Sequence, residues 1–108
     1  MQVFNWNDCN VCLNPIEHIY DTPTHYIRIY TACDGGRWLS GHRVFNKKDG
    51  QYFGSSAPVC GNSKKFFDNE RQAISRELRL FLGWWDLPET VKKVIREHLA
   101  NLSQLSLF

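Results

Sequence analysis

Hydrophobic and polar positions alternate most clearly between residues 24 and 55. This stretch contains three short runs, HYIRIYTA, RWLSGHRVF and QYFGS, separated by the turn sequences DGG (residues 34–36) and NKKDG (residues 46–50). Alternating aromatic and β-branched residues between glycine-containing turns are typical of β-hairpins. We therefore predict a three-stranded antiparallel β-meander over residues 24–55.

The alternation also assigns the side chains of the first two predicted strands to the two faces of the sheet. Ile27, Ile29, Trp38 and Val44 fall on one face, which we expect to be the core face. One face of an antiparallel sheet is commonly exposed to solvent, so the other face is a candidate binding surface. It combines two tyrosines with three arginines, namely Tyr26, Arg28, Tyr30, Arg37 and Arg43.

Apolar residues recur at helical spacing in two segments after residue 67. The first segment opens at Asp68 or Asn69, and Gln72 would complete a capping box with Asn69. We expect this helix to end near Gly83. Its apolar stripe consists of Ala73, Ile74, Leu78, Phe81 and Trp85, whereas Arg71, Arg76, Glu77 and Arg79 fall elsewhere on the helical wheel.

The second helical segment begins within the sequence DLPE, residues 86–89. Asp86 is expected to cap it and Glu89 to close a capping box, while Pro88 lies in the first turn, where its missing N–H group costs nothing. Its apolar stripe consists of Val91, Val94, Ile95, His98, Leu99 and Leu102. We expect both helices, over residues 68–103, to cover the core face of the sheet.

Residues 1–23 have no hydrophobic period and are rich in Asn, Asp and Pro, which favour turns. We expect an irregular N-terminal segment anchored by Phe4 and Trp6. A chain of 108 residues has the size of one domain. The predicted fold class is therefore α+β, with a three-stranded antiparallel meander packed against two C-terminal helices over residues 1–103, and a short C-terminal peptide over residues 104–108.

The composition excludes few classes of function. Hydrophobic residues make up 43% of the chain and aromatic residues 14%, which argues against wholesale disorder. A formal net charge of +2 is too small to indicate nucleic-acid binding on its own. The N-terminal residues show no basic-then-apolar leader, and no run has the length that crosses a bilayer, so we expect a cytoplasmic protein without membrane contacts.

Four cysteines form a candidate metal site. A Cys-x-x-Cys pair with two further cysteines can hold a structural zinc ion in tetrahedral geometry. The third and fourth cysteines follow the ends of two parallel strands of the meander, so both lie at one edge of the sheet. His18 or His25 could replace one cysteine, and the alternative is that the last two cysteines are ordinary buried thiols. The four residues are Cys9, Cys12, Cys33 and Cys60.

The exposed sheet face carries the mixture of cations and aromatic rings that a nucleic-acid platform uses. Two lysines of the second predicted turn add positive charge near it. The alternative is an ordinary solvated face, with turn lysines that protect a sheet edge. The candidate contact residues are Tyr26, Arg28, Tyr30, Arg37, Arg43, Lys47 and Lys48.

We find no nucleophile paired with a base, no paired carboxylates and no phosphate-binding loop, so we expect no enzymatic activity. His25 and His42 fall on neighbouring predicted strands and could approach each other. Cys9 and Cys12 would be the best redox pair, but they lack the strand-to-helix context that activates such a pair. No small-molecule substrate is indicated.

The last five residues read QLSLF, and all five positions resemble the pentapeptide with which bacterial polymerases, mismatch-repair proteins and other replication factors dock on the sliding clamp. Its C-terminal placement is similar to the common case. The residues are Gln104, Leu105, Ser106, Leu107 and Phe108. The resemblance implies that the glutamine hydrogen-bonds the pocket wall and that the last two residues fill the deeper subsite. The alternative is that the leucines and the phenylalanine continue the second helix into the core.

The resemblance implies a small accessory protein of replication or of a mobile element, recruited to DNA by the bacterial sliding clamp. The residues of the sheet face add a candidate contact with nucleic acid. The order of a strand, a GRW-containing strand, a further strand and a helix that opens with DNERQA is similar to that of small accessory proteins of phages and plasmids. The alternative function is a phage or mobile-element inhibitor that blocks a host defence or replication enzyme by occupying its surface.

Overall fold

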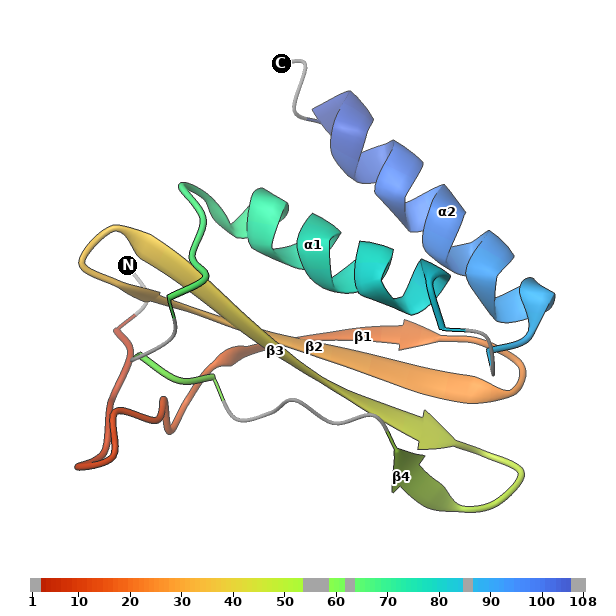
Figure 1. Cartoon of the computed structure of the whole chain (residues 1–108), viewed down its shortest axis with the longest axis horizontal. Helices are drawn as coiled ribbons and strands as arrows, with labels where there is room; N and C mark the ends of the chain where they lie inside the picture. The colour runs from red at the N-terminus through yellow and green to blue at the C-terminus, as the bar shows by residue number, and fades with distance from the viewer. Residues whose placement is uncertain (1–2, 54–58, 62–63, 85–86, 106–108) are drawn as a thin grey trace.

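The computed structural model describes residues 3–53, 59–61, 64–84 and 87–105, without the side chains of residues 53 and 103–105. Its centre is a four-stranded antiparallel sheet in the order β1-β2-β3-β4, and two helices cover one face (Figure 1). The α+β fold class predicted from the sequence is confirmed. The elements are β1 (Ile16–Asp21), β2 (His25–Asp34), β3 (Arg37–Asn46), β4 (Gln51–Phe53), α1 (Glu70–Leu82) and α2 (Glu89–Leu105).

Strand β1 was not predicted, and the expectation that all of residues 1–23 are irregular is wrong. Residues 16–21 pair antiparallel with β2, so that His18 lies opposite Ile29 and Tyr20 opposite Ile27. The outward-facing positions of β1 include Ile19, which is 55% exposed, between two acidic residues. A strand of six residues at the edge of a sheet, bounded by two prolines, gives only a weak hydrophobic signal in the sequence.

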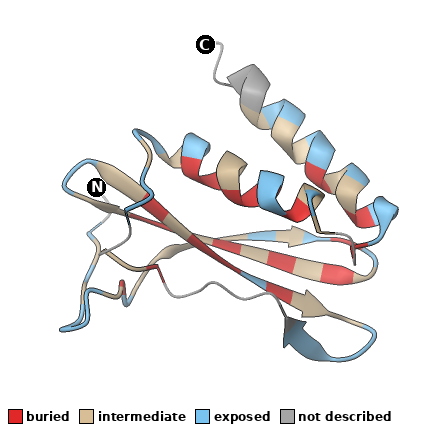
Figure 2. Cartoon of the chain, viewed as in Figure 1, coloured by how far each residue is buried: buried red, intermediate tan, exposed pale blue. Residues whose placement is uncertain are grey.

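The main core lies between the sheet and the helices, on the predicted face. Ile27 pairs with Val44 across β2 and β3, and both side chains are fully buried. Figure 2 shows the buried residues along the strands and on the sides of the helices that face them. The main core consists of Ile27, Ile29, Val44, Ile74, Leu78, Phe81, Leu87, Val91 and Ile95.

The ends of α1 agree with the sequence prediction. The side chain of Asn69 accepts a hydrogen bond of 2.9 Å from the backbone N–H group of Gln72, as an N-cap does. The Gln72 side chain accepts from the N–H group of Asp68 at 3.2 Å, one residue before the cap position expected for a capping box. Gly83 ends the helix. The predicted cap of α2, Asp86, lies outside the described residues.

The opposite face of the sheet is covered at one end by the N-terminal segment. Leu39 is 1% exposed there, although strand alternation places it away from the helices. It belongs to a second cluster, Cys12, Ala32, Leu39 and Val59, with Phe4, Trp6 and Tyr30 packed against it. The exposed platform predicted on this face is therefore limited to the other end of the sheet.

Asparagine side chains hold this N-terminal segment in place. Asn7 Oδ1 accepts from the N–H groups of Cys9 and Val11 at 2.8 and 3.0 Å. Asn14 Oδ1 accepts from the N–H group of Asn5 at 2.7 Å. Such side-chain bonds replace the ladder bonds of a strand. The turn-forming residues that suggested irregular structure are thus the residues that order the segment.

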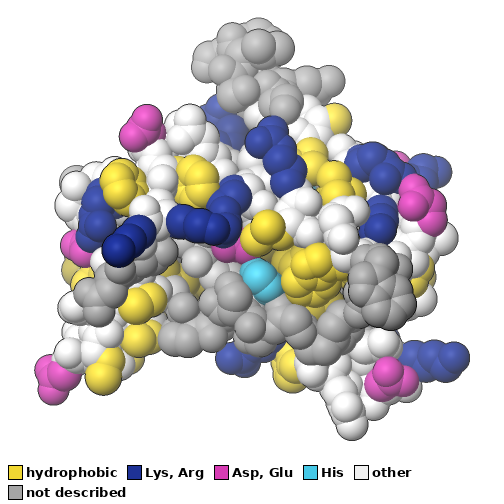
Figure 3. Space-filling model, in the orientation of Figure 1, with side chains coloured by type: hydrophobic (Ala, Val, Ile, Leu, Met, Phe, Trp, Pro, Cys, Tyr) yellow, Lys and Arg dark blue, Asp and Glu magenta, His cyan; other side chains and the backbone are white. Residues whose placement is uncertain are grey.

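The solvent side of the helical layer is basic. Arg71 and Arg79 on α1 are exposed, and Arg76 is half-buried. Figure 3 shows Lys and Arg side chains over this layer, with hydrophobic surface between them. Among the described residues, no helix is long and apolar enough to cross a membrane.

Candidate nucleic-acid interface and docking tail

Three aromatic rings form a row on the sheet face away from the helices. Strand register places Tyr26 opposite Phe45, and Phe45 opposite Tyr52. The Tyr26 and Phe45 rings are stacked with centroids 6.2 Å apart, and the Phe45 and Tyr52 centroids are 5.0 Å apart. Tyr52 is 48% exposed. Three strands thus contribute to one aromatic row, in which Tyr52 is exposed and Tyr26 and Phe45 are half-buried.

Two arginines lie directly opposite each other beside this row. Arg28 on β2 pairs in register with Arg43 on β3. Like charges at directly opposed positions destabilise a sheet, and a bound anion would relieve that repulsion. The Arg43 guanidinium lies 5.4 Å from the centroid of the Tyr52 ring. We call Tyr26, Arg28, Arg43, Phe45 and Tyr52 the sheet-face site.

Arg28 is held in place only loosely by acidic residues. Its Nε atom lies 3.8 Å from the Glu17 carboxylate, which is too far for a hydrogen bond. That Nε atom is buried and has no hydrogen-bond partner. Its pKa is raised, first by a hydrogen bond with Tyr30 and further by the neighbouring Glu17. The guanidinium therefore keeps its charge, whereas its Nε–H donor is buried and unused in the described part of the chain.

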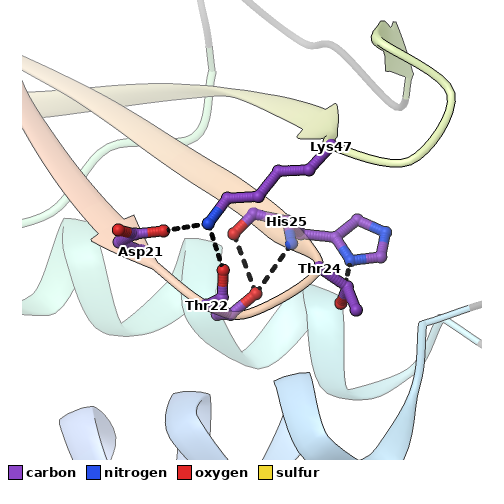
Figure 4. A network of polar contacts seen from close by, with 5 residues as sticks. All are labelled: Asp21, Thr22, Thr24, His25 and Lys47. Atoms are coloured by element: carbon purple, nitrogen blue, oxygen red, sulfur yellow. Dashed lines mark hydrogen bonds and ion pairs between the residues drawn. The ribbon is translucent and has the colours of Figure 1, made fainter.

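Lys47 has a structural partner instead of a free charge. Its Nζ atom donates to Asp21 Oδ1 at 2.5 Å and to the Thr22 carbonyl at 2.6 Å, and it lies 4.2 Å from the Tyr26 ring centroid. The Thr22 hydroxyl in turn donates to the His25 carbonyl and accepts from the His25 N–H group. These hydrogen bonds join the residues around the turn between β1 and β2 (Figure 4). Lys47 thus fastens the β3 end to the β1–β2 turn. Lys48 is exposed.

Arg37 is the predicted contact residue that the structure separates from the others. It precedes Arg43 by six positions on β3, which corresponds to about 20 Å along a strand. It pairs with Asp34 at 3.2 Å and packs against the Phe66 ring. Tyr30 lies between, half-buried beside the second cluster. The structure thus separates Arg37 from the other predicted contact residues. It adds Phe45 and Tyr52, which were not among the predicted residues, to the row that contains Tyr26.

The four cysteines do not form a common site in the described part of the chain. Cys9 is exposed, and Cys12 is buried in the second cluster with Ala32 and Leu39. Strand alternation places Cys33 on the opposite face from Ala32. Among the described residues, no group of three or more Cys, His, Asp or Glu side chains could hold a metal ion.

A buried polar network joins α1 to the sheet. Glu77 is 1% exposed, and its two carboxylate oxygens accept from Ser40 Oγ and contact His42 Nδ1, both at 2.7 Å. Burial by itself raises the pKa of Glu77, but the hydrogen bonds from His42 and Ser40 and the nearby Arg76 outweigh burial, so the pKa is lowered. The His42 ring packs edge-on against Phe81 at 4.9 Å. We interpret this network as part of the packing between the layers.

A second polar network joins the start of α1 to β1 and β2. Thr31 Oγ1 donates to Glu70 Oε2 at 2.6 Å, and His18 Nε2 lies 3.2 Å from the same oxygen. Glu70 and Glu77 are seven residues apart, so they occupy the same face of α1. The predicted approach of His25 to His42 does not occur, because His25 pairs with Asn46 while His42 pairs with Ile29, four positions further along β2.

The terminal peptide begins within α2. The helix continues to Leu105, so the backbone of Gln104 is helical and the predicted boundary after residue 103 falls inside the last turn. Ser106, Leu107 and Phe108 lie outside the described residues. The predicted docking role of the peptide stays a prediction. Along the apolar stripe of α2, burial decreases from Val91 and Ile95, which are 0% and 1% exposed, to the half-buried Leu99 and Leu102.

Comparison with known proteins gives no relative: no protein-family model, no curated protein and no solved structure matches this chain.

Proposed function

We propose that this chain is an accessory protein of bacterial replication or of a mobile element, which docks on the sliding clamp through Gln104–Phe108 and holds single-stranded nucleic acid on its sheet-face site. The observation that carries the proposal is the pentapeptide QLSLF at the end of α2. A protein with this function would act in the bacterial cytoplasm.

The decrease in burial along α2 supports the docking part of the proposal. A helix that closes the core would keep its stripe buried to its last turn. Here Ile95 is sealed in the main core, whereas Leu102, two turns later, is only packed against its edge. Figure 1 shows the last turns of α2 directed away from the sheet. The described part of α2 thus leaves the main core before the pentapeptide begins.

The sheet-face site supports the nucleic-acid part of the proposal. Stacking of bases on aromatic rings requires exposed rings, and cations beside the rings attract the phosphates. The row from Tyr26 to Tyr52 supplies the rings, of which Tyr52 is exposed. The opposed pair, Arg28 and Arg43, supplies the cations. The site combines residues of three strands, β2, β3 and β4, and its rings suit stacking with unpaired bases better than reading the grooves of a duplex.

The two contacts are expected to act together. A five-residue peptide binds with a dissociation constant on the order of micromolar, and a small stacking surface is similarly weak. Linking two weak contacts raises the effective concentration of the second partner. The chain would therefore concentrate single-stranded nucleic acid near the clamp.

A recruitment assay tests the combined function. Immobilised sliding clamp is incubated with a labelled oligo(dT) strand, with and without the protein. We expect the protein to increase the retained label, and L107A/F108A to return retention to the level of clamp alone. The matched control N101A changes an exposed α2 residue before the pentapeptide. Equal retention with L107A/F108A and N101A would contradict the proposal.

A further inference from the structure

A groove runs over the outer face of α1 and reaches the end of α2. Its volume is about 630 Å³, and its walls include Phe67, Leu80 and Leu102 as well as polar side chains. Leu80 is 38% exposed although it is a large apolar residue. The groove is lined mainly by residues of α1, which lies over one face of the sheet (Figure 1). The sheet-face site is made of strand positions that alternate with the core residues and therefore face the other way.

Three arginines line this groove, and we therefore call it the arginine groove. Arg71 and Arg79 are eight residues apart on α1, which places them on one ridge about 12 Å apart along the helix axis. Arg76 lies between them on the neighbouring ridge, in line with Leu80. Charged guanidinium groups and apolar side chains therefore lie next to each other along the walls of the groove.

The positive charge of the arginine groove is not balanced locally. No acidic side chain is among its described lining residues. Arg76 has the buried carboxylate of Glu77 at 3.6 Å, but within the described part of the chain neither Arg71 nor Arg79 makes an ion pair. Arg71 also lies in the first turn of α1, where the helix dipole disfavours a cation. Arg71 thus reduces helix stability slightly, whereas Arg79 lies in the last turn, where the dipole favours a cation. A bound anionic group would offset the cost at Arg71.

We propose that the arginine groove binds an acidic segment of a partner protein, with carboxylates on Arg71 and Arg79 and an apolar side chain against Leu80 and Leu102. The guanidinium fork matches a carboxylate in a bidentate contact. A protein segment fits better than a nucleic acid because the apolar lining consists of Leu80, Leu102 and a single aromatic ring, Phe67, and not of a row of stacking rings as on the sheet face. This proposal concerns a separate surface and does not depend on clamp docking.

Fluorescence anisotropy with a labelled peptide of repeating Glu-Glu-Leu triplets tests the proposal on the full chain. We expect saturable binding that weakens as salt is added, with affinity reduced by about tenfold or more in R71E/R79E. The matched control K93E reverses an exposed charge on α2 outside the groove. The variant L80N should weaken binding without changing net charge. Thermal unfolding of each variant checks that the fold is intact.

Three results would overturn this proposal. The first is failure of the acidic peptide to bind, or equal binding to R71E/R79E and K93E. The second is equal affinity for a peptide in which every Glu is replaced by Gln, since the carboxylates would then be irrelevant. The third is a loss of oligo(dT) binding in R71E/R79E with no loss of peptide binding, which would assign the groove to phosphates.

Discussion

The carboxylate of Glu77 lies 2.7 Å from Nδ1 of His42, in the buried layer between α1 and β3. The two side chains are 1% and 7% exposed, so this contact is shielded from solvent on both sides. Burying a carboxylate without partners would cost several kcal/mol, but Ser40 and Arg76 also contact this one. This polar pair thus adds a specific contact to the packing of α1 on the sheet.

We predict that Glu77→Gln destabilises the fold by about 2 kcal/mol at neutral pH, since a charged acceptor is replaced by a neutral one. The folded-state pKa of Glu77 is lowered from its ordinary value of 4.5, so its contribution is complete above pH 4.5 and is lost as the pH falls through the lower folded pKa. The difference between wild type and variant should therefore shrink in acid.

Urea unfolding at neutral pH and well below pH 4.5 measures this difference. Glu97 on α2 provides a matched control, because Glu97→Gln removes a carboxylate that is exposed to solvent. A free-energy difference for Glu77→Gln that is the same at both pH values would show that the charge of Glu77 plays no part.

A second prediction concerns the sheet face away from the helices. Leu39→Ala should cost about 2–5 kcal/mol of stability, because Leu39 is sealed beneath the N-terminal segment. Ile19→Ala on the same face should cost less than about 0.5 kcal/mol, since Ile19 is 55% exposed. Chemical unfolding compares the two. Similar losses in both variants would mean that the second cluster is not a true core.

A third prediction concerns the aromatic row. Phe45→Ala should weaken binding of oligo(dT) by about 1–3 kcal/mol, which is the range measured for one stacked base. Phe66→Ala is the matched control, because Phe66 is a phenylalanine that is 49% exposed and lies outside the row. Anisotropy titrations measure both affinities. A loss of equal size in the two variants would exclude a specific role for the row.

The opposed arginines give a fourth prediction. If Arg43 contacts a phosphate, Arg43→Gln should reduce the slope of log affinity against log salt by about 0.7 for a single strand. Arg37→Gln, at the far end of the same strand, should leave the slope unchanged, since Arg37 already pairs with Asp34. A slope that is unaffected by Arg43→Gln would remove this residue from the interface.

Much of the fold could be predicted from the sequence because local patterns and tertiary packing agree. Alternation assigned Ile27 and Val44 to the core face, and both are fully buried as a cross-strand pair. The cap at Asn69 and the helix end at Gly83 followed from residue types that favour these positions. These features depend on neighbours in the chain, which a sequence displays directly.

The errors concern features that depend on residues distant in the chain. Glu77 falls outside the apolar stripe of α1, yet it is buried because Ser40 and His42 on β3 supply its partners. Leu39 is buried on the outer face because the N-terminal segment folds over it. The candidate site was predicted in part: alternation identified Tyr26 and the two opposed arginines, whereas the row with Phe45 and Tyr52 required the strand register.

Binding of the sliding clamp to the full chain, measured by titration calorimetry, tests the central claim most directly. We predict a dissociation constant on the order of micromolar for the wild type, and at least about a tenfold loss for Leu107→Ala combined with Phe108→Ala. Asn101→Ala should bind like the wild type. No measurable binding of the wild type, or equal affinities for all three proteins, would contradict the account.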